Sequence, residues 1–472
     1  MNNLAISILL CQALSGWPML HHDAMRTGRT SEVVYDPVAP PNVVWKVSIP
    51  GATPPIVGPD SSVYVCTTQG TILRIFRLNA ITGGQVWVRS IASPASYPVV
   101  PALSPTGDTI YGAWCFDPAW YGHLYALNAS NGSTIWEVVL PGSGSWILNP
   151  LAVDLEGKLY TGDFTNPNGM VHCINPNGTF AWSVAVPDIG GEEDLTSISI
   201  DKAREKVIVG GGNNERRLIC LRGTNGGFLW NISVGLPSAP SVCIDPSTGN
   251  IYHAGASGTS YGLTTNGATL WTQNVGSSAS PALSHDASTI YFGSPDGNLY
   301  ALNTANGNNR WPPLAIPGAY GPAVDGEGNL VCPSSNGSLY LVDGSLGSVL
   351  WQVPVASNPL SAPACVRWGT EAWIYVTAGD TVYALTAPAL EVNEGPPEFG
   401  EIGSGSHSDI TCSPVSGGLV FNSKAELGIR IYSADGRLAY SGNLENGQNR
   451  ISLGQGVYLW RAGQYRGKAV VR

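Results

Sequence analysis

Short runs of alternating hydrophobic and polar residues recur along most of the chain, separated by turns rich in Gly, Asn, Asp and Pro. Residues 290–303 are representative, because two alternating runs flank the turn residues Pro295, Asp296 and Gly297. A period of two is typical of β-strands, and these turn residues favour hairpins. The frequent glycines (58) and prolines (35) also interrupt helices. The pattern therefore predicts an all-β protein.

One tryptophan marks each repeat of this pattern, at spacings of 40 to 49 residues. The recurring tryptophans are Trp45, Trp87, Trp136, Trp182, Trp230, Trp271, Trp311 and Trp351. Seven of them follow a glycine by four residues, namely Gly83, Gly132, Gly178, Gly226, Gly267, Gly307 and Gly347. Several of these glycines follow an asparagine, and Asn-Gly supplies the positive φ angles of a tight hairpin. Repeats of this length with four short strands are typical of propeller blades.

The two ends of the repeat array predict how the ring closes. Residues 362–385 contain the middle strands of a unit but no closing tryptophan strand. Residues 43–48 are a tryptophan strand without preceding partners. We therefore expect the N-terminal strand to complete the last blade, which removes open sheet edges and gives an eight-bladed β-propeller. Each tryptophan is expected to bury one blade against the next.

The spacing within the repeat resembles that of a known family. The form Ala-x-Asn-x-x-x-Gly-x-x-x-Trp stands at residues 126–136 and 301–311, with variants at 77–87, 220–230 and 341–351. Two further copies, at 173–182 and 262–271, are one residue shorter. This form resembles the docking motif of pyrroloquinoline-quinone (PQQ)-like β-propeller repeats, and residues 16–28 resemble a segment often found ahead of such propellers. The resemblance covers roughly residues 17–386 and implies a fold, since the family includes dehydrogenases, outer-membrane assembly scaffolds and many other exported proteins.

Both ends of the chain indicate export. Residues 1–16 have the apolar run and small-residue pattern of a signal peptide, although Met1, Asn2 and Asn3 supply no basic side chain. Residues 387–410 read as an acidic linker rich in Gly, Pro and Ser. Residues 411–472 contain short strands that predict a small β-sandwich. Their sequence resembles a type A C-terminal sorting domain of the bacterial type IX secretion system, which implies delivery to the cell surface or medium by way of the periplasm. The alternative is an accessory sandwich that stays attached.

Charge excludes some partners. Only 12% of residues are charged and the net charge is −10, so we expect no binding to nucleic acid or anionic lipid. No run after residue 16 approaches the roughly 20 apolar residues that span a bilayer, which predicts no stable membrane insertion. We expect a monomer. The type IX machinery, acting through residues 411–472, and an unidentified protein or glycan are the expected partners.

A possible ligand-binding mouth is suggested by two connections between blades. Glu192, Glu193 and Asp194 form the densest acidic cluster and follow the Trp182 strand. Trp146 and Asn149 lie in the corresponding connection of the preceding blade. An aromatic ring, an amide and three carboxylates on neighbouring loops could bind a sugar or a cation. An exposed acidic loop that aids solubility is the alternative.

The chain shows no catalytic motif. A PQQ cofactor with Ca²⁺ at the propeller centre would resemble the quinoprotein dehydrogenases, but their adjacent cysteine pair is missing from the nine cysteines here. His21, His22 and Asp23 could ligate a metal, although packing is the favoured interpretation. The remaining histidines are scattered over several blades without a nucleophile motif nearby. We therefore predict no catalytic residues, no metal and no cofactor.

These observations together predict an exported, non-catalytic propeller that acts as a protein- or glycan-binding or scaffold module. The first alternative is a PQQ- and calcium-dependent alcohol or sugar dehydrogenase. The second is a scaffold similar to the outer-membrane assembly propellers.

Overall fold

The structure is a computed structural model. It describes residues 16–92, 98–116, 121–141, 150–163, 169–186, 198–211, 217–234, 242–255, 258–277, 279–319, 321–388, 410–415, 418–424, 427–433, 438–462 and 465–471. The chain divides into two compact units, Met1–Leu390 and Glu391–Arg472, which are described separately. Within the described residues, no helix has the length and apolar character needed to cross a membrane. A short 3₁₀ turn, Lys202–Arg204, interrupts the strands.

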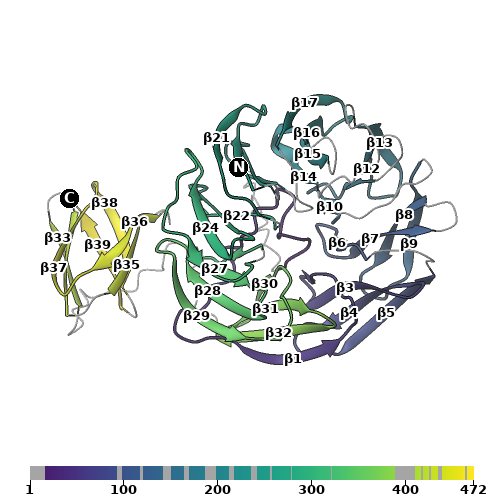
Figure 1. Ribbon diagram of the computed structural model, residues 1–472. Helices are drawn as coiled ribbons and strands as arrows, with labels where there is room; N and C mark the ends of the chain where they lie inside the picture. The colour runs from purple at the N-terminus through teal and green to yellow at the C-terminus, as the bar shows by residue number, and fades with distance from the viewer. Residues whose placement is uncertain are drawn as a thin grey trace, which may run out of the picture. The chain divides into compact units, whose positions relative to one another are not determined.

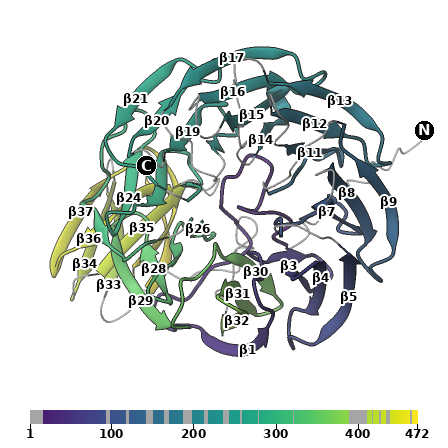
Figure 2. The ribbon, with the colours of Figure 1, turned by 45° about the vertical axis from the view of Figure 1, so that its right-hand side comes forward.

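The described part of the first unit forms eight four-stranded antiparallel sheets arranged in a ring (Figures 1 and 2). Strand order follows the chain within seven of them, from the axis to the rim. The first three blades contain β2 (Ile56–Gly58), β3 (Ser62–Gln69), β4 (Ile72–Asn79), β5 (Gln85–Ala92); β6 (Ala102–Leu103), β7 (Thr109–Phe116), β8 (Tyr121–Asn128), β9 (Thr134–Val139); and β10 (Ala152–Val153), β11 (Leu159–Gly162), β12 (Met170–Ile174), β13 (Phe180–Ala185).

Blades four to seven repeat this order. They contain β14 (Ser199–Asp201), β15 (Lys206–Gly211), β16 (Arg217–Arg222), β17 (Phe228–Ser233); β18 (Cys243–Ile244), β19 (Ile251–Ala254), β20 (Ser260–Leu263), β21 (Thr269–Gln273); β22 (Ala282–Leu283), β23 (Thr289–Gly293), β24 (Asn298–Asn303), β25 (Leu314–Ala315); and β26 (Ala323–Val324), β27 (Leu330–Pro333), β28 (Ser338–Asp343), β29 (Ser348–Pro354).

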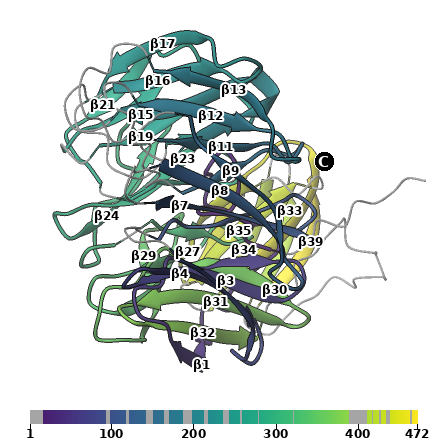
Figure 3. The same cartoon turned by 90° about the vertical axis from the view of Figure 1, so that its right-hand side faces the viewer.

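The eighth blade joins the two ends of the unit. Its inner strands are β30 (Ala364–Trp368), β31 (Glu371–Ala378) and β32 (Thr381–Pro388), and its outer strand is β1 (Asn42–Ser48). Strand β1 pairs antiparallel with β32, as Figure 3 shows from the side. The predicted fold class is therefore confirmed, including closure of the last blade by the N-terminal strand.

The repeated tryptophan links each blade to the next. Its indole N–H donates to a backbone carbonyl in the outer hairpin of the following blade, for example Trp271 Nε1 to Thr304 O at 2.8 Å. The other acceptors are Ala80, Ala129, Pro176, Gly223, Thr265 and Gly344, for Trp45, Trp87, Trp136, Trp182, Trp230 and Trp311. Blades are therefore tied by a hydrogen bond as well as by apolar burial.

The repeated glycine is required at the receiving side of this contact. All seven glycines have positive φ angles, between 68° and 85°. A Cβ on Gly307 would lie 2.7 Å from the Trp271 ring, and one on Gly347 would lie 2.5 Å from the Trp311 ring. Any side chain would therefore collide with the indole and also strain the backbone.

The contact between the seventh and eighth blades has a different partner. Trp351 lies on β29, and the eighth blade has no outer hairpin because its last two strands come from opposite ends of the unit. Trp351 Nε1 donates instead to Asp36 O, at 3.2 Å. The segment ahead of β1 thus takes the place of the missing hairpin.

Tyrosines on the second strand of several blades support the same contact. Tyr64 Oη and Trp87 Nε1 donate to the same oxygen, Ala129 O, at 3.4 and 3.0 Å. Tyr375 and Trp45 share Ala80 O at 3.1 and 2.8 Å in the same way. These tyrosines were not singled out from the sequence, although a tyrosine recurs at this position of the second strand in six of the eight blades; the fourth and seventh blades have Ile208 and Val331 there.

The second unit is a β-sandwich, drawn in yellow in Figure 1. One sheet contains β33 (Ile410–Val415), β34 (Gly418–Ser423) and β37 (Gly447–Ser452). The other contains β35 (Leu427–Ser433), β36 (Leu438–Leu444), β38 (Gly456–Ala462) and β39 (Tyr465–Val471). Phe421 from the first sheet and Trp460 from the second meet edge to face in the shared core. Residues 1–15 of the predicted leader and residues 389–409 of the predicted linker lie outside the described residues, so those boundaries stay predictions.

Candidate functional site

The predicted mouth residues Trp146, Asn149, Glu192, Glu193 and Asp194 all lie outside the described residues. They belong to residues 142–149 and 187–197, which connect the outer strand of one blade to the inner strand of the next. The described geometry therefore does not bring them together or separate them. The mouth stays a prediction.

The axis of the ring is occupied by the chain itself. Residues 16–36 run inside the ring, where Figure 2 shows the purple N-terminal segment surrounded by the inner strands. The inner strand of a propeller blade presents an open sheet edge to the axis, and buried edge N–H groups need an acceptor. The N-terminal segment provides these acceptors.

Six blades use the same position for this contact. The second residue of each inner strand donates its backbone N–H to a carbonyl of the N-terminal segment. The pairs are Val57–Trp17, Leu103–Pro18, Ile200–Ala24, Ile244–Met25, Leu283–Thr27 and Val324–Gly28, with N···O distances of 2.7 to 3.0 Å. One segment that does not repeat therefore satisfies equivalent groups on six repeating units.

The remaining two blades are held by side chains. Arg26 Nη2 donates to Leu151 O, just ahead of the third blade's inner strand, at 2.9 Å. Tyr35 Oη donates to Trp373 O in the eighth blade, also at 2.9 Å. All eight blades are thus bonded to residues 17–35.

Arg26 is the most deeply buried charge at the axis. Its side chain is 0% exposed, and its guanidinium also donates to Leu20 O at 2.5 Å and to Ile198 O at 3.2 Å. Burial lowers the pKa of this guanidinium to about 10, so it remains a cation near neutral pH. Its hydrogen bonds in the described structure go to carbonyls, which connect the third and fourth blades through one side chain.

The residues considered as metal ligands lie next to Arg26. His21 is 5% exposed, and burial lowers its pKa to about 3, so the ring is neutral. His22 packs edge-on against Trp17 at 4.9 Å. Asp23 accepts hydrogen bonds from the Thr27 N–H, at 3.1 Å, and from the Thr27 hydroxyl. Across the described residues, no group of three or more His, Cys, Asp or Glu is placed to hold a metal ion.

Backbone strain gathers in this segment. Three non-glycine residues have positive φ angles: 55° for His21, 72° for His22 and 57° for Arg26. Residues other than glycine adopt this left-handed conformation only at a cost in free energy. A Cβ on Gly28 would lie 3.0 Å from the Ala282 side chain, and one on Gly321 would lie 2.5 Å from His21. Close packing against the inner strands holds these conformations in place.

The structure brings together a Ser–His–Asp cluster that sequence analysis missed. In the third blade, His172 Nδ1 lies 2.8 Å from Ser183 Oγ, and His172 Nε2 lies 3.1 Å from Asp163 Oδ2. His172 and Ser183 are cross-strand partners of β12 and β13. Asp163 follows β11 and is fixed by the Met170 N–H at 2.9 Å. The sequence analysis looked for a nucleophile motif near each histidine and did not find this contact, because the three residues lie nine and eleven positions apart and meet only in the folded blade.

Burial decides what this cluster can do. The side chains of His172 and Asp163 are both 0% exposed. In a catalytic triad, the histidine takes the proton of the serine and passes it to the leaving group of the substrate. A fully buried imidazole does not reach a substrate. The hydrogen bonds instead satisfy a buried imidazole and carboxylate inside the blade.

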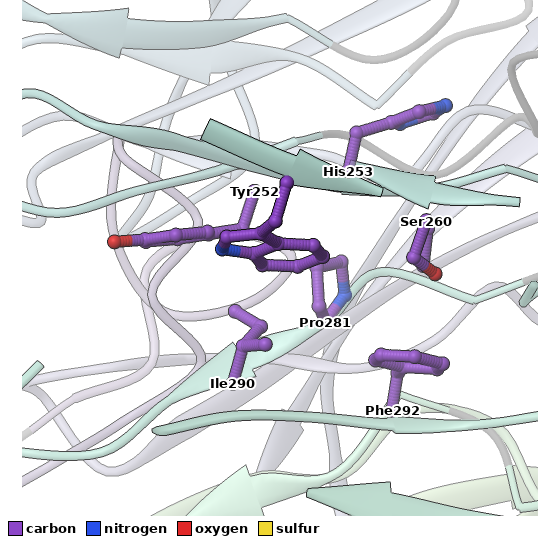
Figure 4. Close-up of a pocket in the computed structure, with 8 residues that line it drawn as sticks. Tyr252, His253, Ser260, Pro281, Ile290 and Phe292 are labelled. Atoms are coloured by element: carbon purple, nitrogen blue, oxygen red, sulfur yellow. The ribbon is translucent and has the colours of Figure 1, made fainter. Parts of the chain in front are cut away.

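A small cavity lies between the fifth and sixth blades (Figure 4). Tyr252, Trp271, Ile290 and Phe292 line it, and its interior is too tight for a water molecule. Figure 4 shows His253 on the opposite side of β19 from Tyr252. His253 is 3% exposed, and its two ring nitrogens find no hydrogen-bond partner within the described structure. Burial lowers its pKa to about 4.

Comparison with known proteins places the fold. Residues 167–313 match the family described as outer membrane protein assembly factor BamB. Quinohemoprotein alcohol dehydrogenase ADHIIG of Pseudomonas putida HK5 is similar in structure, with a TM-score of 0.66, 14% identity, and coverage of 82% of this chain and 84% of that one. The quinohemoprotein alcohol dehydrogenase of Comamonas testosteroni has a TM-score of 0.63 and 14% identity, with coverage of 80% of this chain and 82% of that one. BamB of Moraxella catarrhalis has a TM-score of 0.53 and 17% identity, with coverage of 73% of this chain and 97% of that one.

These likenesses define a class of fold. The chain carries BamB-like repeats over residues 167–313 and has the β-propeller fold shared by quinoprotein dehydrogenases and BamB. Identities of 14 to 17% show the fold alone. No curated protein matches the chain.

Proposed function

We propose that this propeller is an exported, non-catalytic module that binds a protein or a glycan, or holds an assembly together. The observation that carries the proposal is the filled axis. Residues 17–35 bond to all eight blades, and the fully buried Arg26 lies among them. A central cofactor would compete with this segment for the same inner-strand edges.

The chemistry of the axis supports this proposal over the dehydrogenase alternative. Calcium requires six to eight oxygen ligands, usually with carboxylates among them. The described axis offers the guanidinium of Arg26 and backbone carbonyls that it already occupies. Asp23 directs both of its carboxylate oxygens to Thr27. A resident cation beside Arg26 would also experience charge repulsion.

The match to the BamB family over residues 167–313 favours a scaffold role as the second candidate. A binding face on the mouth loops would combine Trp146, Asn149, Glu192, Glu193 and Asp194. For delivery, we propose cleavage of residues 1–16 and recognition of residues 411–472 by a type IX secretion apparatus.

Two measurements test these proposals. Mature protein is incubated with PQQ and Ca²⁺ and passed through gel filtration, and dye reduction is followed with alcohols and aldoses. We expect no retained quinone absorbance and no turnover, and stoichiometric retention with turnover would overturn the binding-module proposal. Mass spectrometry of the culture medium is expected to find a chain that begins near residue 16 and lacks residues 411–472. A full-length chain confined to the cytoplasm would contradict the export proposal.

The mouth can be tested on a glycan array. The double variant Glu192→Gln/Glu193→Gln and the variant Trp146→Ala should each weaken a detected glycan signal at least tenfold. The control Glu205→Gln/Glu371→Gln removes the same charge from exposed positions in the fourth and eighth blades. Equal signals from the mouth variants and the control would rule out this mouth for that glycan.

A further inference from the structure

We propose that residues 17–48 form a donor arm, which binds the ring as a separate peptide would. The ring of one copy of the chain can then accept the donor arm of a second copy. The arm comprises the axial segment and strand β1. Both bind surfaces that the rest of the propeller leaves incomplete, namely the inner-strand edges and the free edge of β32. The partner is therefore another molecule of this chain.

The first support is the chemistry of the contact surface. The inner-strand N–H groups of six blades point at the axis in one repeated arrangement and donate to successive backbone carbonyls of the arm. Recognition through backbone groups is the mode by which sheets take up an added peptide. Side chains then fix the register, since Trp17 is 2% exposed, Arg26 is 0% and Tyr35 is 1%.

The second support is the way the arm completes the ring at the rim. Strand β1 pairs along β32 from Asn42 opposite Thr386 to Ser48 opposite Thr381. Trp45 on β1 donates to Ala80 O in the first blade, and Asp36 accepts from Trp351 in the seventh. One continuous segment therefore joins the eighth blade to both of its neighbours. Its removal would take away the Trp45 donor to the Ala80 carbonyl and the Asp36 acceptor of the Trp351 indole N–H.

The third support is the route by which the arm could leave. Residues 29–36 cross from the axis over inner hairpin turns: Arg29 donates to Ser284 O, and the Gly326 N–H donates to Val33 O. The arm rejoins the ring only through residues 49–55, where Pro50 and Gly51 are exposed. Because the arm is joined to the ring through this hinge, its exchange between copies would open the eighth blade at the edge between β1 and β32 and leave the other seven four-stranded sheets intact. Exchange of an identical terminal element is a low-cost route to association.

The experiment cuts the hinge in the folded, full-length protein. A protease recognition sequence is inserted at Gly51, the purified protein is cleaved, and the products are passed through native gel filtration. Fluorescently labelled peptide of residues 16–50 is then added in excess. We expect the cut arm to co-elute with the ring, and the labelled peptide to replace it in a time-dependent manner.

Two peptide variants make the test specific. A labelled arm with Arg26→Met should replace the native arm roughly 100-fold less well or worse, whereas Arg29→Met should weaken replacement only about fivefold. Mixing two differently labelled uncut proteins at high concentration should give species that carry both labels. Loss of the arm on cutting without binding of added peptide would overturn the proposal. So would retention without any replacement up to the denaturation midpoint, because the arm would then be an integral part of the ring.

Discussion

The rim and the axis of this propeller are held by two different kinds of contact. At the rim, a tryptophan of one blade donates to a hairpin carbonyl of the next, and the contact repeats with the blades. At the axis, one non-repeating segment bonds to every blade, mostly through its backbone. A repeated side-chain contact leaves a period in the sequence, whereas a backbone contact made once leaves almost none.

The comparison also separates stability from function. The rim contacts repeat from blade to blade and hold the fold together, and a fold by itself does not define a function. The axial segment instead fills the space that the ring encloses and bonds to its inner strands.

The largest effect is expected at the axis. Arg26→Met removes a buried cation and leaves the carbonyls of Leu20, Leu151 and Ile198 without that donor. We expect a loss of about 3–5 kcal/mol in the free energy of unfolding, measured by urea denaturation. Arg29→Met is the control, with a loss of about 1 kcal/mol expected, because its bonds lie nearer the surface. Equal losses would show that Arg26 has no special role.

The rim contact is expected to be the next most sensitive. Gly347→Ala places a Cβ 2.5 Å from the Trp311 ring at a φ of 68°. Gly369→Ala meets nothing within 4 Å at a φ of 61°, so it isolates the backbone cost. We expect losses of about 3 kcal/mol for Gly347→Ala and about 1 kcal/mol for Gly369→Ala in thermal or urea unfolding. A difference below about 0.5 kcal/mol would mean that the Trp311 ring can move aside.

Acid should weaken the ring through its buried histidines. Burial lowers the pKa of His253 to about 4 and that of His21 to about 3, so both stay neutral in the folded state where the unfolded chain takes up protons. Their contribution to stability is complete above pH ~6.5 and falls as the pH drops toward these values. Each of the two histidines should lower the free energy of unfolding by about 2 kcal/mol at pH 5 relative to pH 7. Burial raises the pKa of Asp325 to about 6, which acts in the opposite direction.

The variant His253→Gln isolates one histidine from these opposing effects. When the pH is lowered from 7 to 5, both proteins should lose unfolding free energy. The loss in His253→Gln should be about 2 kcal/mol smaller than the loss in the native protein. Urea titrations at the two pH values measure the difference. Identical pH dependence in both proteins would disprove a neutral, buried His253.

The smallest effect is expected inside the third blade. Ser183→Ala removes the hydroxyl 2.8 Å from His172 Nδ1 and should cost about 1–2 kcal/mol. A fluorophosphonate probe should leave Ser183 unlabelled in the folded protein, because His172 has no exposed surface. Labelling of Ser183 followed by loss of an esterase activity in Ser183→Ala would make this cluster a catalytic site.

Sequence predicted the repeating part of the molecule well. The tryptophan and glycine spacing indicated four-stranded blades, and the unpaired tryptophan strand at residues 43–48 indicated closure with residues 362–385. These features are visible because a large ring and a residue free of Cβ must recur wherever one blade meets the next. The tyrosines that share acceptors with Trp45 and Trp87 recur as well and were overlooked.

The axis could not be predicted in the same way. Carbonyls of Pro18, Ala24 and Gly28 bind inner strands, and a backbone carbonyl places no demand on the residue type. The Ser183–His172–Asp163 cluster was equally hidden, since its members meet only through strand register. The predicted mouth around Trp146 and Glu192 lies outside the described residues and stays a prediction.

Hydrogen–deuterium exchange of the inner-strand amides tests the filled axis most directly. The N–H groups of Val57, Leu103, Ile200, Ile244, Leu283 and Val324 are open sheet edges unless the N-terminal segment covers them. We predict that these amides exchange as slowly as those of the middle strands, and that Arg26→Met accelerates them before the rest of the ring. Rapid exchange of these six amides in the folded native protein would contradict the account.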